Sequence, residues 1–137
     1  MPVRISSVDY FHATVQEQPG GAYNLLSRLA QAGVNLLAFN AVPVGPEHTQ
    51  LVLFPDDPDR FVDVAERTDL GISGPAHAFL IQGDDELGAL ARIHRQLLDA
   101  EVDVYASTGV TDGRGGFGYV VYVRDEDHEK AARALEV

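Results

Sequence analysis

Cysteine and tryptophan are absent from this chain of 137 residues, methionine occurs once, and 10 basic residues stand against 21 acidic ones. Without cysteine the chain has neither disulfides nor thiolate chemistry, although this does not fix its redox compartment. The net charge of −11 and the lack of a basic cluster argue against nucleic acid and against an anionic membrane surface as partners. Acidic surfaces mostly serve solubility, so the negative net charge does not identify a binding partner.

Long apolar segments are also missing. The apolar runs at 78–81 and 119–123 are far too short to span a bilayer. The first residues, Met1-Pro2-Val3-Arg4, do not follow the pattern of a signal peptide. We therefore expect a soluble, cytoplasmic protein that binds neither membranes nor nucleic acid.

The chain repeats itself after 68 residues, because a shift of that length superposes its two halves without a gap. Matching pairs include Phe11/Phe79, Gly20/Gly88, Ala32/Ala100, Gly45/Gly113 and Asp57/Asp125. Such self-similarity indicates a duplicated module, which we place at 1–70 and 71–137. One half alone would bury a marginal core, whereas the whole chain can bury a sizeable one.

Each copy shows the same order of elements. In the first copy, alternating residues predict a strand over 8–15, and apolar residues at 22, 25, 26, 29 and 30 predict a helix that Gly33 ends. Strands over 34–42 and 50–54 follow, and Asp57-Pro58 is typical of a helix start. The second copy repeats this with strands over 76–82, 102–110 and 117–124 and a last helix that Asp125 caps.

This order predicts an α+β fold of two ferredoxin-like βαββαβ modules, with the helices on one face of antiparallel sheets. Each module needs a fourth strand after its second helix. The first copy offers 71–73, but the last helix is followed by none in the sequence. The same shift places 3–5 opposite 71–73. We therefore expect the N-terminal strand, over 2–6, to complete the second module.

Two stretches of the first copy carry a recognisable signature. Gln18-Pro19-Gly20-Gly21-Ala22 precedes the helix, and Ala32-Gly33-Val34-Asn35-Leu36 opens the next strand. A weaker version recurs at 87–90 and 100–104. This pattern resembles the ACT domain, in which a polar loop with Pro-Gly leads into an amphipathic helix and Gly-Val/Ile-Asn-Ile/Leu opens the following strand. The resemblance covers the whole chain as two tandem copies.

The resemblance implies a regulatory module that binds a small ligand, mostly an amino acid, at the interface of paired domains. In this family the ligand lies against the first strand–helix loop of one domain and the second-strand region of its partner. The implied ligand-binding residues are Gln16, Glu17, Gln18, Pro19, Gly20, Gly21, Ala22, Asn35, Leu36, Gly88, Asp103, Val104 and Tyr105. No cofactor, metal or catalytic residue is implied.

The chemistry of the first copy suits such a ligand. Free amides at a helix N-terminus attract a carboxylate, and Gly20 and Gly21 let the backbone approach it closely. The amide of Asn35 can bond either end of a zwitterion. A purely structural interpretation stands beside this one, in which the loop is only a turn, Asn35 caps the turn after Gly33 and Glu17 is a solvated charge.

The second copy departs from this pattern. Asp84, Asp85 and Glu86 are expected at the start of its helix, where they would stabilise the helix and repel a ligand carboxylate. Asp103 replaces the asparagine. We expect one asymmetric site, formed by the first loop and the strand at Asp103-Val104-Tyr105. The three carboxylates lack the alternating spacing of a Ca²⁺ loop, so we assign no metal to them.

Two further patterns carry no chemistry of their own. The run 113–118 matches G-x-G-x-x-G, but it joins two strands instead of opening a helix, so we interpret it as a flexible hairpin. Five histidines are scattered without zinc spacing. His94 falls on the apolar stripe of its helix, where a hydrogen-bonded structural role is the simplest interpretation.

Both faces of the third strand of each copy are apolar, at 51–54 and 119–122. Helices cover only one face, so we expect a second copy of the protein to cover the other face or an edge, which predicts a homodimer. The sequence thus predicts a non-enzymatic amino-acid sensor whose regulated protein would be bound in trans. The alternatives are an enzyme using His94, His12 or Asp84/Asp85 in a cleft, and a purely structural interaction module.

Overall fold

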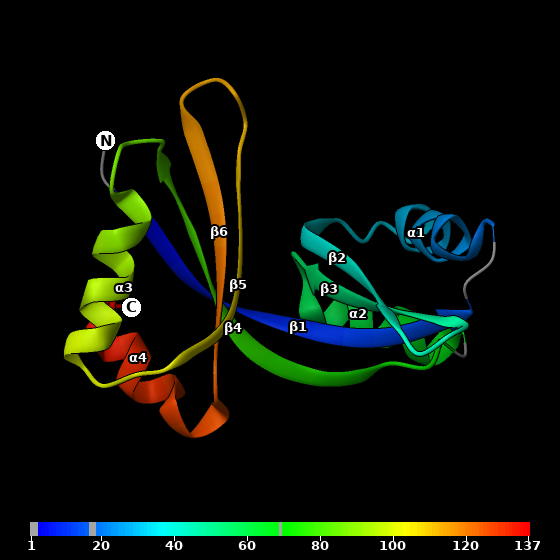
Figure 1. The fold of residues 1–137 in the computed structure, drawn as a ribbon. Helices are drawn as coiled ribbons and strands as arrows, with labels where there is room; N and C mark the ends of the chain where they lie inside the picture. Colours follow the sequence, from blue (N-terminus) through cyan, green and yellow to red (C-terminus); the bar gives the residue numbers. More distant parts are fainter. Residues whose placement is uncertain (1–2, 17–18, 69) are drawn as a thin grey trace. The chain divides into compact units, whose positions relative to one another are not determined.

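The computed structural model describes residues 3–16, 19–68 and 70–137, and Figure 1 shows its elements in chain order. They are β1 (Arg4–Gln16), α1 (Gly21–Gln31), β2 (Leu36–Val44), β3 (His48–Pro55), α2 (Pro58–Arg67), β4 (Ser73–Asp84), α3 (Ala89–Asp99), β5 (Val104–Thr111), β6 (Gly116–Val123), a 3-10 turn (Asp125–Asp127) and α4 (His128–Ala134). The expected alternation of strands and helices is therefore present in both copies.

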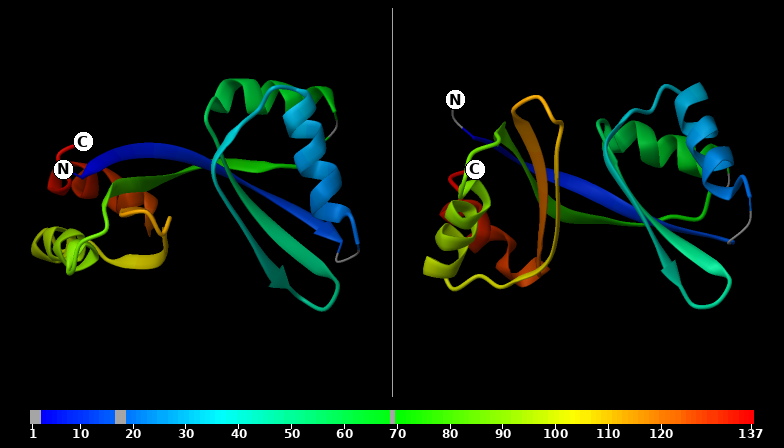
Figure 2. Two further views of the ribbon diagram at one scale, coloured as in Figure 1. Left: turned by 90° about the horizontal axis from the view of Figure 1, so that it is seen from above. Right: turned by 45° about the horizontal axis from the view of Figure 1, so that its top comes forward.

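The chain forms two compact units. Unit 1 comprises Met1–Val8 and His77–Val137, and unit 2 comprises Asp9–Ala76. The strand order is β2-β3-β1-β4 in unit 2 and β1-β4-β6-β5 in unit 1, because β1 and β4 each contribute residues to both units. In each unit two helices lie on one face of the sheet (Figure 2). The predicted ferredoxin-like α+β fold is confirmed.

The first residues complete the second module, as the sequence predicted. Val3 and Ile5 pack against the core of unit 1, and Arg4 Nη2 donates a hydrogen bond of 2.9 Å to Gln82 Oε1 on β4. The two compact units divide the chain at residues 8 and 76, whereas the repeat in the sequence places its boundary at 70. The division into 1–70 and 71–137 stays a prediction about the duplication.

The core of unit 2 forms between its sheet and its two helices. Phe11 and Ala13 on β1 and Leu51 and Leu53 on β3 are buried against the apolar stripes of α1 and α2. Helix α2 begins as expected, with Pro58 in its first turn and the Asp57 carboxylate accepting a hydrogen bond of 3.2 Å from the Arg60 N–H. This cap satisfies one of the free amides at the helix start.

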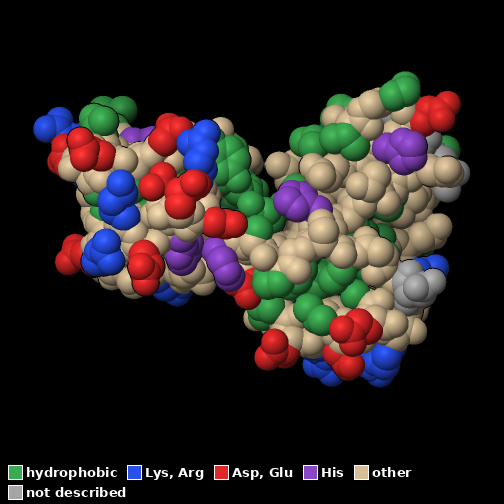
Figure 3. Space-filling model, turned by 90° about the horizontal axis from the view of Figure 1, so that it is seen from below, with side chains coloured by type: hydrophobic (Ala, Val, Ile, Leu, Met, Phe, Trp, Pro, Cys, Tyr) green, Lys and Arg blue, Asp and Glu red, His purple; other side chains and the backbone are tan. Residues whose placement is uncertain are grey.

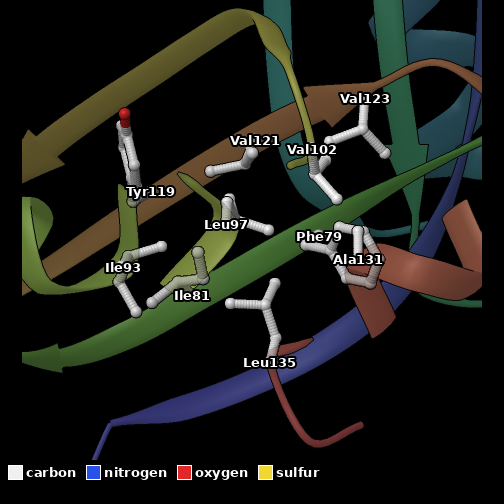
Figure 4. Packing of buried hydrophobic residues seen from close by; sticks show 10 residues of the cluster. All are labelled: Phe79, Ile81, Ile93, Leu97, Val102, Tyr119, Val121, Val123, Ala131 and Leu135. Atoms are coloured by element: carbon white, nitrogen blue, oxygen red, sulfur yellow. The ribbon is translucent and has the colours of Figure 1, made fainter. Parts of the chain in front are cut away.

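The core of unit 1 repeats this arrangement. Figure 4 shows alternate residues of β4 and β6 meeting the inner faces of α3 and α4. The side chains in view are Phe79, Ile81, Ile93, Leu97, Val102, Tyr119, Val121, Val123, Ala131 and Leu135. Because side chains alternate between the faces of a strand, the residues between these core positions lie on the helix-free face.

Two expected helix starts are wrong. Asp125 does not cap the last helix, because a 3-10 turn intervenes and α4 begins at His128. Helix α3 begins at Ala89 with Gly88 as its N-cap, so its first turn holds no acidic residue. The three carboxylates at 84–86 lie before the helix, and of them Glu86 reaches its first turn through an ion pair of 3.2 Å with Arg92. The sequence pattern placed the three carboxylates at the start of the helix, but the helix begins only after the turn at Gly88.

The premise of the homodimer prediction also needs correction. Val52, Phe54 and Val120 lie on the faces opposite the helices, yet they are already buried within the single chain. Exposed apolar side chains lie on the edge strands β2 and β5, and also on α1, on α3, just before α3 and at the C-terminus. They include Leu37, Phe39, Val42 and Val44 on β2 and Tyr105 and Val110 on β5.

Candidate functional site

The first predicted loop lies at the N-terminus of α1 in unit 2. Gly20 is the N-cap residue, with φ of 87°, and a Cβ placed there would meet no atom within 4 Å. A Cβ on Gly21 would come within 3.2 Å of the Gln16 carbonyl oxygen, so the chain turns tightly here. Pro19 is exposed and Ala22 half-buried. Glu17 and Gln18 lie outside the described residues.

The start of α1 presents free backbone donors. Its first turn carries no acidic residue, and in the described part of the chain no side chain caps it. The first amides of a helix have no partner within the helix, and the helix dipole is positive there. Glycine at the cap leaves the approach to these amides open. The local chemistry therefore suits a carboxylate.

Asn35 and Leu36 lie at the opposite end of unit 2. Gln16 and Val44 are both paired with His48, whereas Leu36 is paired with Pro55 at the far end of β3. Helix α1 separates the loop from Asn35 by roughly 16 Å, given about 1.5 Å per residue over its length. The structure therefore does not bring Gly20 and Asn35 together within one unit. The side chain of Asn35 is exposed.

The equivalent strand start in unit 1 is already occupied by an ion pair. Asp103 Oδ2 accepts a hydrogen bond of 3.0 Å from Arg124 Nη1, and the Arg124 guanidinium lies 5.8 Å from the centre of the Tyr105 ring. Burial raises the pKa of the neighbouring Tyr122 hydroxyl above 10.0, and Tyr105 adds to the effect. Val104 is half-buried. These residues form a structural cluster that links β5 to β6.

The loop of unit 1 also differs from that of unit 2. Gly88 has the same role as Gly20, with φ of 81° at the N-cap of α3. The preceding acidic segment is anchored, because Asp85 N–H donates to the Gly115 carbonyl at 2.8 Å and Glu86 pairs with Arg92 at 3.2 Å. A ligand carboxylate approaching Gly88 would meet these negative charges.

The candidate catalytic groups are engaged in packing. His94 Nε2 lies 2.6 Å from the Tyr119 hydroxyl, and both side chains are at least half-buried, which agrees with a structural role. The His12 ring packs edge-on against Tyr10 at 5.4 Å. No group of three or more potential metal ligands occurs among the described residues. None of the described helices is long and apolar enough to cross a membrane.

The charges that Figure 3 displays are mixed in sign. On the face of unit 1 in view, Lys and Arg side chains lie interspersed with Asp and Glu. A continuous basic surface would be needed for sequence-independent binding of nucleic acid. This face does not provide one.

Sequence reasoning missed one cavity. Unit 1 has an open hollow of about 600 Å³, lined among others by Arg4, Gln82, Asp112 and Gly118. The signal was present in the glycine-rich run 113–118, which the sequence analysis interpreted only as a hairpin.

Solved structures of similar fold cover almost the whole chain. The protein BT0572 from Bacteroides thetaiotaomicron matches 96% of this chain and 88% of its own, with a TM-score of 0.80 and 16% identity. The ligand-free regulatory subunit of aspartate kinase from Thermus thermophilus matches 99% and 96%, at a TM-score of 0.67 and 15% identity. The aspartokinase alpha and beta subunits match 99% and 95%, at 0.62 and 16%.

No family model matches the sequence, and no curated protein does. The similarity to these solved structures shows the fold of this chain. The chain is built as two ferredoxin-like modules in tandem, as the repeat predicted.

Proposed function

We propose that this protein is a non-enzymatic regulatory module that binds an amino acid at the first loop of unit 2. The observation that carries the proposal is the open start of α1, where glycine replaces a side-chain cap and the first turn carries no acid. The ligand carboxylate bonds the free amides, and its ammonium group faces a polar residue of a second module. The similarity of the fold to a regulatory subunit of aspartate kinase supports a regulatory role.

A second copy of the chain can complete this site. The exposed apolar side chains of β2 mark that edge as a contact between copies. If two β2 edges paired antiparallel about a twofold axis, the Asn35 end of one copy would lie beside the first loop of the other. Asn35 suits this position better than Asp103, because Arg124 already holds the Asp103 carboxylate. We therefore propose a homodimer with the ligand between copies.

The proposal is tested by a thermal-shift screen of the full chain against the twenty amino acids at millimolar concentration. A ligand present at 100 times its Kd should stabilise the native state by about 2.7 kcal/mol, a shift of several degrees. Gly20→Asp places a carboxylate at the mouth of the site, in a left-handed backbone conformation that Asp and Asn adopt more readily than most side chains but less readily than glycine. Gly20→Asn is its uncharged match.

We expect one amino acid to stabilise the protein, with the shift lost in Gly20→Asp, largely kept in Gly20→Asn and reduced in Asn35→Ala. Asn35 is exposed, so its replacement should leave folding intact. The proposal fails if no amino acid produces a shift, or if the shift survives in both Gly20→Asp and Asn35→Ala.

A further inference from the structure

The hollow in unit 1 lies on the helix-free face of the sheet. Gly118 on β6 is paired with Gln82 on β4 and with Val110 on β5, so these three residues share one face. Their neighbours Ile81 and Tyr119 belong to the core beneath the helices, which places the row on the other side. Arg4 extends the row, because its neighbours Val3 and Ile5 pack against the same core.

A missing side chain creates this hollow. Gly113 and Gly115 adopt φ of 75° and 95°, which the hairpin turn requires of glycine. Gly118 has no such φ, and a Cβ added there would meet no atom within 4 Å. Neither backbone strain nor crowding therefore demands glycine at this position. Its effect is to leave space in the middle of the sheet face.

Charges of both signs line this space, namely Arg4 and the carboxylates of Asp84 and Asp112. The Arg4 guanidinium is held over β4 by its 2.9 Å hydrogen bond to Gln82, and its other N–H groups can serve a ligand. The Asp112 carboxylate reaches back over β6, because its Oδ2 lies 3.0 Å from where a Cβ of Gly116 would be. Asp112 Oδ1 is used by the turn, accepting from the N–H groups of Arg114 and Gly116 at 2.6 and 3.1 Å.

The spacing of the two charges sets the size of a ligand. Gly116 and Gly118 are two residues apart, roughly 7 Å along a strand, and β4 and β6 are neighbours about 4.8 Å apart. A molecule that bonds both charged groups must therefore hold its own charges a few ångströms apart. The same N–H groups of Arg114 and Gly116 lower the pKa of Asp112 below 3.8, which keeps the carboxylate negative near neutral pH.

The duplication makes this feature specific to unit 1. In the first copy, Gln50 and His48 stand where the second has Gly118 and Gly116, and Ile72 and Val44 stand where it has Arg4 and Asp112. The first copy therefore has neither the two glycines nor the two charges.

We propose that the hollow is a second binding site, which takes a small zwitterion with its acidic group on Arg4 and its ammonium group on Asp112. The site is independent of the first loop and of the function proposed for it. Both charged residues are exposed, so each contact is weak in water, and we expect dissociation constants on the order of 1 mM.

The test is calorimetric titration of the full chain with glycine, β-alanine and γ-aminobutyrate, whose charges are successively further apart. Acetate and propylammonium each carry one of the two charges and serve as controls. Gly118→Val fills the hollow with a residue that suits a strand. Asp112→Asn removes the negative charge but keeps the oxygen that the turn uses, and Arg4→Gln removes the positive charge. Arg114→Gln changes a charge of the same hairpin outside the hollow.

We expect at least one of the three zwitterions to bind about tenfold more tightly than acetate or propylammonium. Its binding should weaken about tenfold or more in Gly118→Val, Asp112→Asn and Arg4→Gln, and remain unchanged in Arg114→Gln and Asn35→Ala. The proposal is overturned if none of the three zwitterions binds, if acetate binds equally well, or if Gly118→Val leaves the binding intact. A ligand lost in Asn35→Ala but kept in Gly118→Val belongs to the first loop, so the two proposals can fail separately.

Discussion

Single residues fix the local geometry on which both proposed sites depend. Gly20 and Gly88 end their loops in the same left-handed conformation, although the residues around them differ in charge. At the β5–β6 hairpin the Asp112 carboxylate accepts two backbone N–H groups, which is the pattern by which Asp closes a turn. One side chain thus stabilises the hairpin and presents its second oxygen to the hollow.

The lowered pKa of Asp112 predicts a pH dependence of stability. Hydrogen bonds from the Arg114 and Gly116 N–H groups favour the ionised form in the folded protein. Their stabilisation is present above the unfolded value of 3.8 and is lost as the pH falls through the lower folded pKa. In thermal unfolding between pH 6 and 2, the difference in Tm between the wild type and Asp112→Asn should be constant above about pH 4 and shrink below it.

Arg114→Ala is the matched control, because the donor is the backbone N–H and survives the change. The Tm of Arg114→Ala should depend on pH in the same way as the Tm of the wild type. Curves for wild type and Asp112→Asn that run parallel down to pH 2 would contradict the assignment.

Among the elements, β1 and β4 differ most from what the sequence pattern suggested. Both are long strands that give one end to each unit, whereas the pattern predicted separate short strands around residues 2–6, 8–15, 71–73 and 76–82. Ser6-Ser7 and Gly74-Pro75 interrupt the apolar alternation, so the pattern ended a strand at each place, yet both segments lie inside continuous strands. The second module is complete only with residues from the N-terminal end of the chain.

Removal of residues 1–6 should therefore destabilise the protein. Val3 and Ile5 would be lost from the core of unit 1, and Gly83, which lies beside Val3, would be exposed. Loss of two partly buried apolar side chains together with strand pairing should lower the free energy of unfolding by about 2–4 kcal/mol. Chemical denaturation measures this value directly.

Asp63→Ala serves as the comparison, because it breaks an exposed i,i+4 ion pair with Arg67 and should cost well under 1 kcal/mol. If the truncated chain unfolds at the same denaturant concentration as the full chain, the N-terminal strand does not complete the module.

At the scale of the whole molecule, exposed apolar side chains lie on both edge strands as well as on α1, on α3 and just before α3. Neither β2 nor β5 contains a charged residue, although charges on an edge are a common way to prevent pairing between chains. Pro43, near the end of β2, is a residue of the kind that does hinder such pairing. The β2 edge is the surface through which we propose that two copies pair.

We predict that light scattering with size-exclusion chromatography will find a dimer joined through β2. Replacing Phe39 and Val42 together by lysine would bring like charges together at that contact and should yield monomers. The matched change on the other edge, Tyr105 and Val110 to lysine, should leave the dimer intact. A monomeric wild type, or a dimer that persists in the β2 variant, would contradict this arrangement and with it the role given to Asn35.

The sequence by itself determined the duplication, the α+β order of each module, and the helix boundaries that single residues signal, such as Asp57-Pro58 and Gly33. These features depend on local chemistry, namely spacing, caps and backbone freedom, which a sequence displays directly. The helix starts predicted at Asp125 and at residues 84–86 are wrong, because in each case a turn that no local rule anticipates precedes the helix.

Only the tertiary structure decided which residues meet. The antiparallel register separates Gly20 from Asn35 by the length of a helix, and Arg124, distant in sequence, pairs with Asp103. The same register places Arg4 in the row of Gln82 and Gly118 and bends Asp112 over the neighbouring strand. Contacts of this kind arise from strand order and register, which bring together side chains 21 residues apart in Asp103 and Arg124 and 78 apart in Arg4 and Gln82, and no spacing along the chain encodes them.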